Sequence, residues 1–324
     1  MTSAPHNVGM LVFDGMKLLD FAGPTEVFAE ANHHGGNYQI SLVSADGRDV
    51  RTSMGLVIAV DTAAASARAF DTVIVAGGEV FPAGDVSDSL VTAVRGMSRH
   101  ASRTASICTG AFVLAAAGLL DGKRATTHWA HARELSLRYP RTRVEPNSIF
   151  VKDESIYSSA GVTAGIDLAL ALVEEDEGID VARAVARSLV VYLQRDGGQL
   201  QFSTGLPDSV PRGSLLQSVI DAVHADPAAE HTIASLAEIA RVSPRHLSRL
   251  FRDELETTPG KYVELIRIDR AKVLLDDGRT VTDVAASSGF GTSESLRRAF
   301  ISHLSIPPSK YRGRFSSAGA RADR

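Results

Sequence analysis

Two kinds of hydrophobic pattern divide the chain. Before residue 196, short apolar runs alternate with segments of helical periodicity. The apolar runs at 7–13 and 72–76 are typical of buried strands, and further strands are predicted at 38–44 and 104–108. Residues 18–31, 87–102 and 164–175 are predicted as helices. Further extended pairs are predicted at 51–60 and 148–158. Strands that alternate with helices predict an α/β domain, in which a mostly parallel sheet carries helices on both faces.

One predicted helix of this domain, residues 180–193, is apolar on nearly every turn. Its stripe consists of Val181, Val185, Leu189 and Leu193, and a stripe of this kind has to be buried. Packing against its own sheet and contact with a second copy of the chain are both compatible with the pattern.

The composition changes after this helix. Residues 197–214, GGQLQFSTGLPDSVPRGS, are rich in Gly, Ser and Pro, and we expect an interdomain linker there. Helical periodicity resumes at residue 215 and continues to 315, which predicts an all-α second domain. We therefore divide the chain into domains at 1–196 and 215–315, with a disordered tail at 316–324.

The stretch from Thr232 to Glu254 predicts a helix-turn-helix. Ser243 is a suitable N-cap for the second helix, and Pro244 fits its first position, where no backbone N–H is needed. Apolar residues mark the buried side of the two helices: Leu236, Ile239, Ala240, Leu247, Leu250 and Phe251. The opposite side of the second helix carries Arg245, Arg249 and Arg252, with His246 and Ser248 on its flanks. Such a face is either solvated or turned toward DNA phosphates and bases.

The pattern occurs a second time, which favours DNA binding. Val281, Val284 and Ala285 repeat the first helix, and Arg298 takes the place of Arg249. We expect the second turn, SSGFGT, to be about four residues longer than the first. A helix at 259–275 would hold two reading helices at the spacing of adjacent major grooves, about 34 Å. Together the repeats predict two helix-turn-helix motifs.

Individual DNA contacts can be assigned from these faces. Arg245 and Arg249 are the expected base readers, because a bidentate arginine–guanine contact contributes ~1–3 kcal/mol of discrimination. Glu294 either accepts from a cytosine amine or pairs with Arg298, four residues on. The other expected DNA contacts are Arg297 on the second reading helix and, on the connecting helix, Arg267 and Lys272.

Several motifs, in one order, resemble a known family. SPRHLSRLFRDE, IRIDRAKVLL, VTDVAASSGFGTSESLRRAF and IPPSKYR are similar to the AraC/XylS transcriptional regulators over roughly residues 215–315. This resemblance implies that the chain binds double-stranded DNA, with RNA polymerase as a further partner. It also implies that activation is the expected mode of regulation.

The most informative stretch of the first domain is SICTGAFVLAAAGLLDGKRATTHW, residues 106–129. A predicted strand runs into Cys108, and a helix leaves at once, which is the form of a nucleophile elbow. The start of that helix would favour a thiolate at Cys108, although a single cysteine in an apolar chain is often an inert buried residue.

This domain resembles a second family. VFDGMKLLDFAGPTEVF, VAGGE, the elbow stretch and GVTAGIDLALALVEE are similar to the ThiJ/PfpI superfamily, whose sheet is akin to that of class I glutamine amidotransferases. Several enzymes of the superfamily have a histidine after the elbow cysteine, whereas this chain has Thr109. A Cys-Thr pair with Asp20 resembles the isocyanide hydratase branch. The combination with an AraC-type domain resembles the GlxA-type regulators, in which the first domain is taken to sense a small molecule or to dimerise.

The resemblance and the strand ends together outline a ligand pocket. Its expected residues are Asp20, Gly78, Cys108, Thr109 and His128, because the carboxyl ends of strands in open α/β sheets bind ligands. Asp20 could equally cap the helix that follows it, and His128 could be a base or a structural hydrogen-bonding residue.

Composition narrows the function further. Residues 213–324 carry 16 Lys/Arg against 14 Asp/Glu, and residues 1–212 carry 18 against 24, so the positive charge lies with the predicted DNA-binding domain. One cysteine excludes a disulfide framework, and we expect no metal or cofactor. No run is long enough to cross a membrane, and we expect a cytoplasmic protein. The prediction is a homodimeric regulator with an unidentified small-molecule effector and no enzymatic role. A Cys108-dependent hydratase or hydrolase and a thiol redox sensor are the alternatives.

Overall fold

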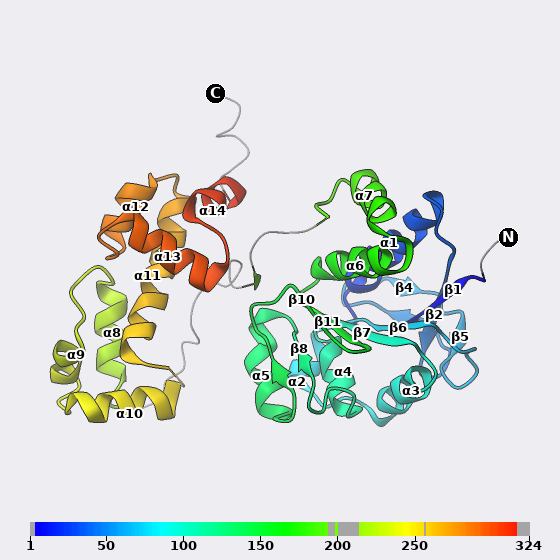
Figure 1. The fold of residues 1–324 in the computed structure, drawn as a ribbon. Helices are drawn as coiled ribbons and strands as arrows, with labels where there is room; N and C mark the ends of the chain where they lie inside the picture. Colours follow the sequence, from blue (N-terminus) through cyan, green and yellow to red (C-terminus); the bar gives the residue numbers. More distant parts are fainter. Residues whose placement is uncertain (1–3, 194–197, 200–213, 256, 316–324) are drawn as a thin grey trace. The chain divides into compact units, whose positions relative to one another are not determined.

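A seven-stranded sheet forms the centre of the first domain, in the order β10-β11-β7-β6-β1-β2-β5 (Figure 1). Its strands are β1 (His6–Leu11), β2 (Tyr38–Ser44), β5 (Thr62–Ala63), β6 (Thr72–Val75), β7 (Arg103–Ile107), β10 (Phe150–Asp153) and β11 (Ile156–Ser159). All neighbours are parallel except β10 and β11. The central strands β6 and β7 are buried along their whole length, as expected for strands of a parallel sheet that is covered on both faces.

Two smaller strand pairs flank this sheet. β3 (Val50–Arg51) and β4 (Val57–Ile58) form an antiparallel hairpin, and β8 (Arg124–Ala125) and β9 (Arg143–Val144) form a parallel pair. The hairpin overlaps the predicted extended pair at 51–60 and begins one residue earlier. The strands β5, β8 and β9 are not predicted from the sequence, because two residues are too few to show a period.

Helices cover both faces of the sheet (Figure 1). One layer contains α1 (Leu18–His33), α6 (Ala164–Glu177) and α7 (Ile179–Ser188), which pack on one another. The opposite layer contains α2 (Val80–Ala83), α3 (Asp88–Ser98), α4 (Gly110–Ala116) and α5 (Ala132–Arg138), the last preceded by a 3₁₀ turn, η1 (Trp129–His131). The α/β fold class expected from the sequence is confirmed.

The helix expected at 180–193 is shorter than predicted. α7 ends at Ser188, because Val190 adopts a left-handed φ of +56° and the N–H groups of Val190 and Val191 donate back to the carbonyls of Arg187 and Ala186. This bonding pattern closes a helix. Within α7, Ala182 and Val185 are fully buried, and the helix packs on α6 and α1. Of the predicted stripe, Val185 is buried, whereas Val181, Leu189 and Leu193 are partly buried against the core of the same domain, so this domain covers the stripe only in part.

The computed structural model describes residues 4–193, 198–199, 214–255 and 257–315. It separates two compact units, Met1–Leu200 and Gln201–Arg324. Most of the predicted linker, 197–214, and the predicted tail, 316–324, lie outside the described residues. Gln199, within the predicted linker range, is buried in the first unit and donates to the carbonyls of Thr127 and Ser148.

The regular elements of the second unit are all helices over its described residues. Its helices are α8 (Gln217–Ala225), α9 (Ile233–Ile239), α10 (Pro244–Leu255), α11 (Pro259–Asp276), α12 (Val281–Ser287), α13 (Ser293–Leu304) and α14 (Pro308–Phe315). Threonine N-caps, whose hydroxyls accept a backbone N–H, start four of them: Thr232, Thr258, Thr280 and Thr292. The long helix α11 packs on helices of both repeats and joins them, as predicted.

The two helix-turn-helix repeats differ by one residue in their turns, so the expected difference of about four residues is wrong. Residues 240–243 separate α9 from α10, and residues 288–292 separate α12 from α13. The buried pair of the first helix is Leu236 and Ala237, and that of the second is Val284 and Ala285. In comparing the two repeats, the sequence prediction placed Val281 in the position of Leu236, whereas Val284 occupies that position in the structure. This shift of about one helical turn made the second turn look too long.

Candidate functional site

Cys108 occupies the sharp turn between β7 and α4, with a left-handed φ of +55°. Non-glycine residues rarely adopt this conformation, and it is typical of functional turns. Gly110 makes the turn sterically possible, because a Cβ there would lie 2.5 Å from the carbonyl oxygen of Val75. The predicted elbow is therefore present.

The thiolate expected at Cys108 is not favoured. Burial, together with the neighbouring Asp20 carboxylate, raises the pKa of the thiol to about 12. The N–H groups of Val162 and Thr109 oppose this shift but do not overcome it. Cys108 is only 2% exposed and α4 is a helix of seven residues, so desolvation outweighs the helix N-terminus. The cysteine is a protonated thiol at neutral pH.

Asp20 lies beside Cys108 and is fully buried in the first turns of α1. Its Oδ2 accepts the N–H of Gly77 at 3.1 Å, whereas Oδ1 has no hydrogen-bond partner among the residues that the structure describes. Burial raises the pKa of Asp20 to about 6, against the lowering influence of the Gly77 N–H. Gly77 is part of the contact, since a Cβ there would meet both Asp20 Oδ2 and Cys108 Cβ within 2.8 Å.

Thr109 and Gly78 join the ends of β7 and β6. The Thr109 hydroxyl accepts the N–H of Gly78 at 2.8 Å and donates to its carbonyl oxygen at 2.6 Å. The hydroxyl is thereby engaged in both roles, and its main effect is to hold the glycine loop against the elbow. The sequence-predicted group of Asp20, Gly78, Cys108 and Thr109 is brought together in the folded chain.

His128 stands on the neighbouring segment. Thr127 donates its hydroxyl to the Cys108 carbonyl at 2.8 Å, and the His128 ring lies directly against Gly161, where a Cβ would be 2.1 Å from the ring. The Nδ1 atom of His128 accepts the N–H of Ala130 and caps η1. Burial lowers the pKa of this imidazole, which favours its neutral form.

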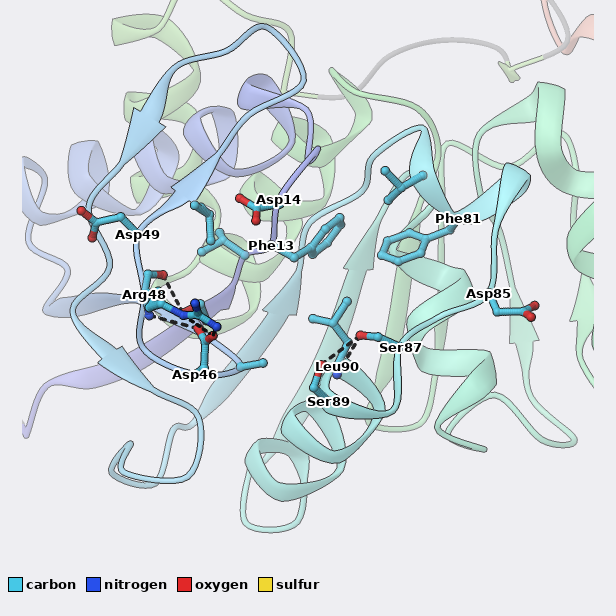
Figure 2. A pocket seen from close by; sticks show the side chains of 15 residues that line it. Phe13, Asp14, Asp46, Arg48, Asp49, Phe81, Asp85, Ser87, Ser89 and Leu90 are labelled. Atoms are coloured by element: carbon cyan, nitrogen blue, oxygen red, sulfur yellow. Dashed lines mark hydrogen bonds and ion pairs between the residues drawn. The ribbon is translucent and has the colours of Figure 1, made fainter.

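A cavity of about 460 Å³ opens beside the ends of β1 and β2, a volume suited to a small metabolite. Buried apolar residues form its floor, and the rings of Phe13 and Phe81 are 4.6 Å apart between centroids. Figure 2 shows these two rings together, with Asp49 and Asp85 on either side. None of the five pocket residues expected from the sequence lines this cavity.

The described residues gather no group of three or more His, Cys, Asp or Glu side chains placed to hold a metal ion. No helix in the described part of the chain is long and apolar enough to span a membrane.

The first predicted reading helix is α10. The hydroxyl of Ser243 caps its N-terminus by accepting the N–H of His246. Leu247 and Phe251 are fully buried, and they direct the opposite face outward. Arg245, Arg249 and Arg252 are exposed on that face and make no hydrogen bond or ion pair with any residue that the structure describes. Three exposed guanidinium groups on one helix that have no ion-pair partner among the described residues can contact phosphates and base edges.

The second predicted reading helix, α13, differs in charge. Glu294 forms a bidentate ion pair with Arg297, with N···O distances of 2.8 and 2.9 Å. The predicted partner of Glu294 was Arg298, which instead is exposed and unpaired within the described ranges. An (i, i+3) pair can form here because both side chains are exposed and lie on the same side of the helix.

The connecting helix supplies no free cation at the two expected positions. Arg267 is half-buried and donates to the carbonyl oxygens of Pro227 and Ala229, at 2.8 and 2.9 Å. Lys272 is buried and pairs with Asp269. Both side chains were expected to contact phosphate. Instead, Arg267 is engaged by the loop between α8 and α9, and Lys272 is buried beside Asp269 on its own helix.

Comparison with known proteins agrees with this architecture. The DJ-1/PfpI family model matches residues 6–175, more than half of the chain, and a helix-turn-helix domain model matches residues 236–314. The HTH-type transcriptional regulator GlxA of Rhizobium meliloti is 32% identical over 325 residues, covering 96% of this chain and 97% of GlxA. The chain belongs to the GlxA-type regulators of the AraC family. Its first domain is a DJ-1/PfpI domain, and its second binds DNA.

Two further comparisons concern the first domain of this regulator. A solved AraC family transcriptional regulator from Pseudomonas putida is 26% identical, with a TM-score of 0.50, and covers 57% of this chain and all of that one. The isonitrile hydratase of Pseudomonas putida is 34% identical over 206 residues, covering 63% of this chain and 84% of the hydratase. The same fold thus occurs in regulators and in an enzyme.

Sequence reasoning missed parts of the regulator's first domain. The sequence showed Gly77 only as one of two glycines at the end of a strand. Nothing in the sequence indicated that it lies between Asp20 and Cys108, where there is no room for a side chain. Val162, whose N–H faces the cysteine sulfur, has a φ of +45° that no local motif predicts. The Phe13–Phe81 contact joins residues far apart in the sequence, so no local pattern indicates the cavity.

Proposed function

We propose that this regulator reads two adjacent major-groove segments, with α10 as the principal base-reading helix. The observation that carries this proposal is the exposed face of α10, whose three arginines pair with no residue that the structure describes. Arg245 and Arg249 would contact base edges, and Arg252 would contact phosphate, with His246 and Ser248 at the margins of the interface. The hydroxyl of Ser248 donates to the Pro244 carbonyl, so it would act as an acceptor toward DNA.

The second helix, α13, contributes mainly through Arg298. Arg297 would reach DNA only when its pair with Glu294 opens, and Glu294 would then face the DNA as an acceptor for a cytosine amine. This division of roles gives one strong and one weak half-site, so the operator is expected to be asymmetric.

The first domain is proposed to bind a small-molecule effector and to form a homodimer. The cavity beside Phe13 and Phe81 supports effector binding, since its volume is within the range of metabolite sites. Catalysis is not part of this proposal, because the protonated Cys108 is a poor nucleophile at neutral pH. We further propose that the regulator is an activator that contacts RNA polymerase in the cytoplasm, as the resemblance to AraC/XylS proteins implies.

Selection of bound sites from random duplexes by the full chain tests the DNA proposal. A defined operator is expected, and Arg245→Ala and Arg249→Ala should weaken its binding while leaving the fold intact. Arg68→Ala, in the first domain, is the matched control. If the folded protein shows no preference for any duplex sequence, with or without a metabolite mixture, the proposal fails. A thermal-shift screen of metabolites tests the effector, because a ligand of the native state raises its apparent stability.

The second candidate function is that of a Cys-dependent hydratase. The grouping of Asp20, Cys108 and Thr109 and the relationship to an isonitrile hydratase favour it. Incubation of the full chain with an isonitrile decides between the two: turnover that Cys108→Ser abolishes, with operator affinity unchanged, would establish an enzyme attached to a DNA-binding domain. Absence of turnover would leave ligand sensing as the role of the domain.

A further inference from the structure

Arg267 lies at the junction between the two helix-turn-helix repeats. It stands near the middle of α11, and its guanidinium forks toward the loop between α8 and α9. The Nε atom donates to the Pro227 carbonyl at 2.8 Å and an Nη atom donates to the Ala229 carbonyl at 2.9 Å. This loop leads directly into α9, the first helix of the first repeat.

The turn between α12 and α13, in the second repeat, lies against the same guanidinium. Gly289 lies between α12 and α13, with a left-handed φ of +82°. A Cβ at this position would be 2.7 Å from Arg267 Nε, 2.8 Å from Ala228 Cα and 2.9 Å from the Pro227 carbonyl oxygen. The turn of the second repeat therefore rests on Arg267 and on the loop that Arg267 holds.

We propose that Arg267 is a positioning residue that sets the orientation of the two repeats and, through it, the spacing between the two halves of the operator. The inference rests on the proposed binding of α10 and α13 to successive grooves. Its structural basis is the meeting of three segments, the α8–α9 loop, α11 and the α12–α13 turn, at one planar guanidinium.

The chemistry of the side chain explains why an arginine stands here. A guanidinium presents its donors in a rigid plane and can satisfy two carbonyls in a fixed geometry, whereas a lysine ammonium is a single point donor on a flexible stem. The two carbonyls lie in a loop that enters the first repeat, and the guanidinium contacts the turn that enters α13. Loss of the fork would allow the two repeats to move relative to each other without removing any DNA contact.

The energetic consequence follows from linked binding. Two linked modules that bind together gain affinity over either alone, by about 10²–10⁴-fold, and lose that gain when their geometry no longer matches the sites. Arg267→Lys is therefore expected to weaken binding of the full operator by about tenfold or more. Binding of each isolated half-site should change little, because the exposed arginines of α10 and α13 are untouched.

The experiment measures the affinity of the full-length protein for three duplexes: the selected operator and each of its halves embedded in unrelated sequence. A series of operators with one or two base pairs inserted or removed between the halves reports the spacing preference. Arg267→Lys should bind this series with a flatter profile than the unmodified protein. Arg270→Lys, an exposed arginine on the same helix, is the matched control and should keep the sharp profile.

A second variant approaches the junction from the other side. Gly289→Ala places a methyl group against Arg267 at a backbone conformation that alanine adopts poorly, so it should flatten the spacing profile in the same way. The effects of the two substitutions should not be additive, because they disturb one contact.

Two outcomes would overturn the inference. One is an unchanged spacing profile in folded Arg267→Lys; the other is an equal loss of affinity for the full operator and for each half-site, which would indicate general destabilisation. A failure of the proposed function gives a different result, since the unmodified protein would then show no preferred duplex and no spacing profile at all.

Discussion

Glu294 and Arg297 lie one turn apart on α13 and are joined by two hydrogen bonds of 2.8 and 2.9 Å. The pairing neutralises one arginine of the second reading helix, whereas Arg298 forms no ion pair within the described residues. On α10, in contrast, all three arginines of the exposed face are unpaired within the described residues. The two repeats therefore share a fold but present different charge to a duplex.

Removal of the carboxylate should release Arg297 for DNA. Glu294→Gln is expected to raise affinity for unrelated duplexes and to make the salt dependence steeper by about one unit of log K against log [salt], since each added phosphate contact contributes about 0.9. Fluorescence anisotropy over a salt series measures this slope. An unchanged slope would indicate that Arg297 does not reach the phosphates even when it is free.

The arginines of α10 are expected to differ in what they contact, which is a base for Arg249 and a phosphate for Arg252. Arg249→Ala should lose ~1–3 kcal/mol on the preferred operator and relax the preference at one base pair, as loss of a bidentate base contact does. Arg252→Ala should instead weaken binding to all duplexes about equally and reduce the salt slope by about one unit. Repeated site selection with each variant separates these effects, and identical profiles for the two variants would contradict the assignment.

The buried carboxyl of Asp20 gives the first domain a defined pH dependence. Burial raises the pKa of Asp20 from 3.8 to about 6, so the folded chain retains a proton that the unfolded chain loses at lower pH. The stability contributed by Asp20 is therefore fully present below about pH 4 and is lost as the pH rises through about 6. The shift corresponds to a difference on the order of 3 kcal/mol.

Asp20→Asn tests this dependence, because the amide oxygen can still accept the Gly77 N–H and carries no charge. The variant should be more stable than the unmodified protein at pH 8, and the difference should shrink toward pH 4. Urea unfolding at several pH values measures it, with the exposed Glu177→Gln as the control. A difference that is constant with pH would show that the pKa of Asp20 is the same in the folded and unfolded chain.

Cys108 should react slowly with electrophiles. Burial raises the pKa of its thiol to about 12, and only the thiolate is an effective nucleophile. At pH 8 alkylation by iodoacetamide is expected to be on the order of 1000-fold slower in the folded protein than in urea. Mass spectrometry gives a clear count, because the chain has one cysteine. Rapid labelling of the folded protein would favour the redox-sensor alternative instead.

Much of the fold could be predicted because its signals are local. The continuous apolar run at 72–76 predicted β6, and Ser243 with Pro244 predicted the start of α10, since strand burial and helix capping depend on residues within one or two turns. The predictions that failed concerned longer range. The end of α7 depended on the backbone of Val190, and the register of the second repeat depended on which apolar pair faces the core.

The sequence by itself determined the two domain classes, the elbow at Cys108 and the exposed arginines of α10, because periodicity, capping residues and glycine positions carry that information. Only the tertiary structure decided that Cys108 is a protonated thiol, that Arg267 joins the two repeats and that the cavity lies beside Phe13 and Phe81. The protonation of Cys108 depends on its burial and on the neighbouring Asp20 carboxylate, which is distant along the chain. The hydrogen-bond partners of a side chain such as Arg267 likewise depend on how whole helices and loops pack together, and no local pattern of residues specifies that packing.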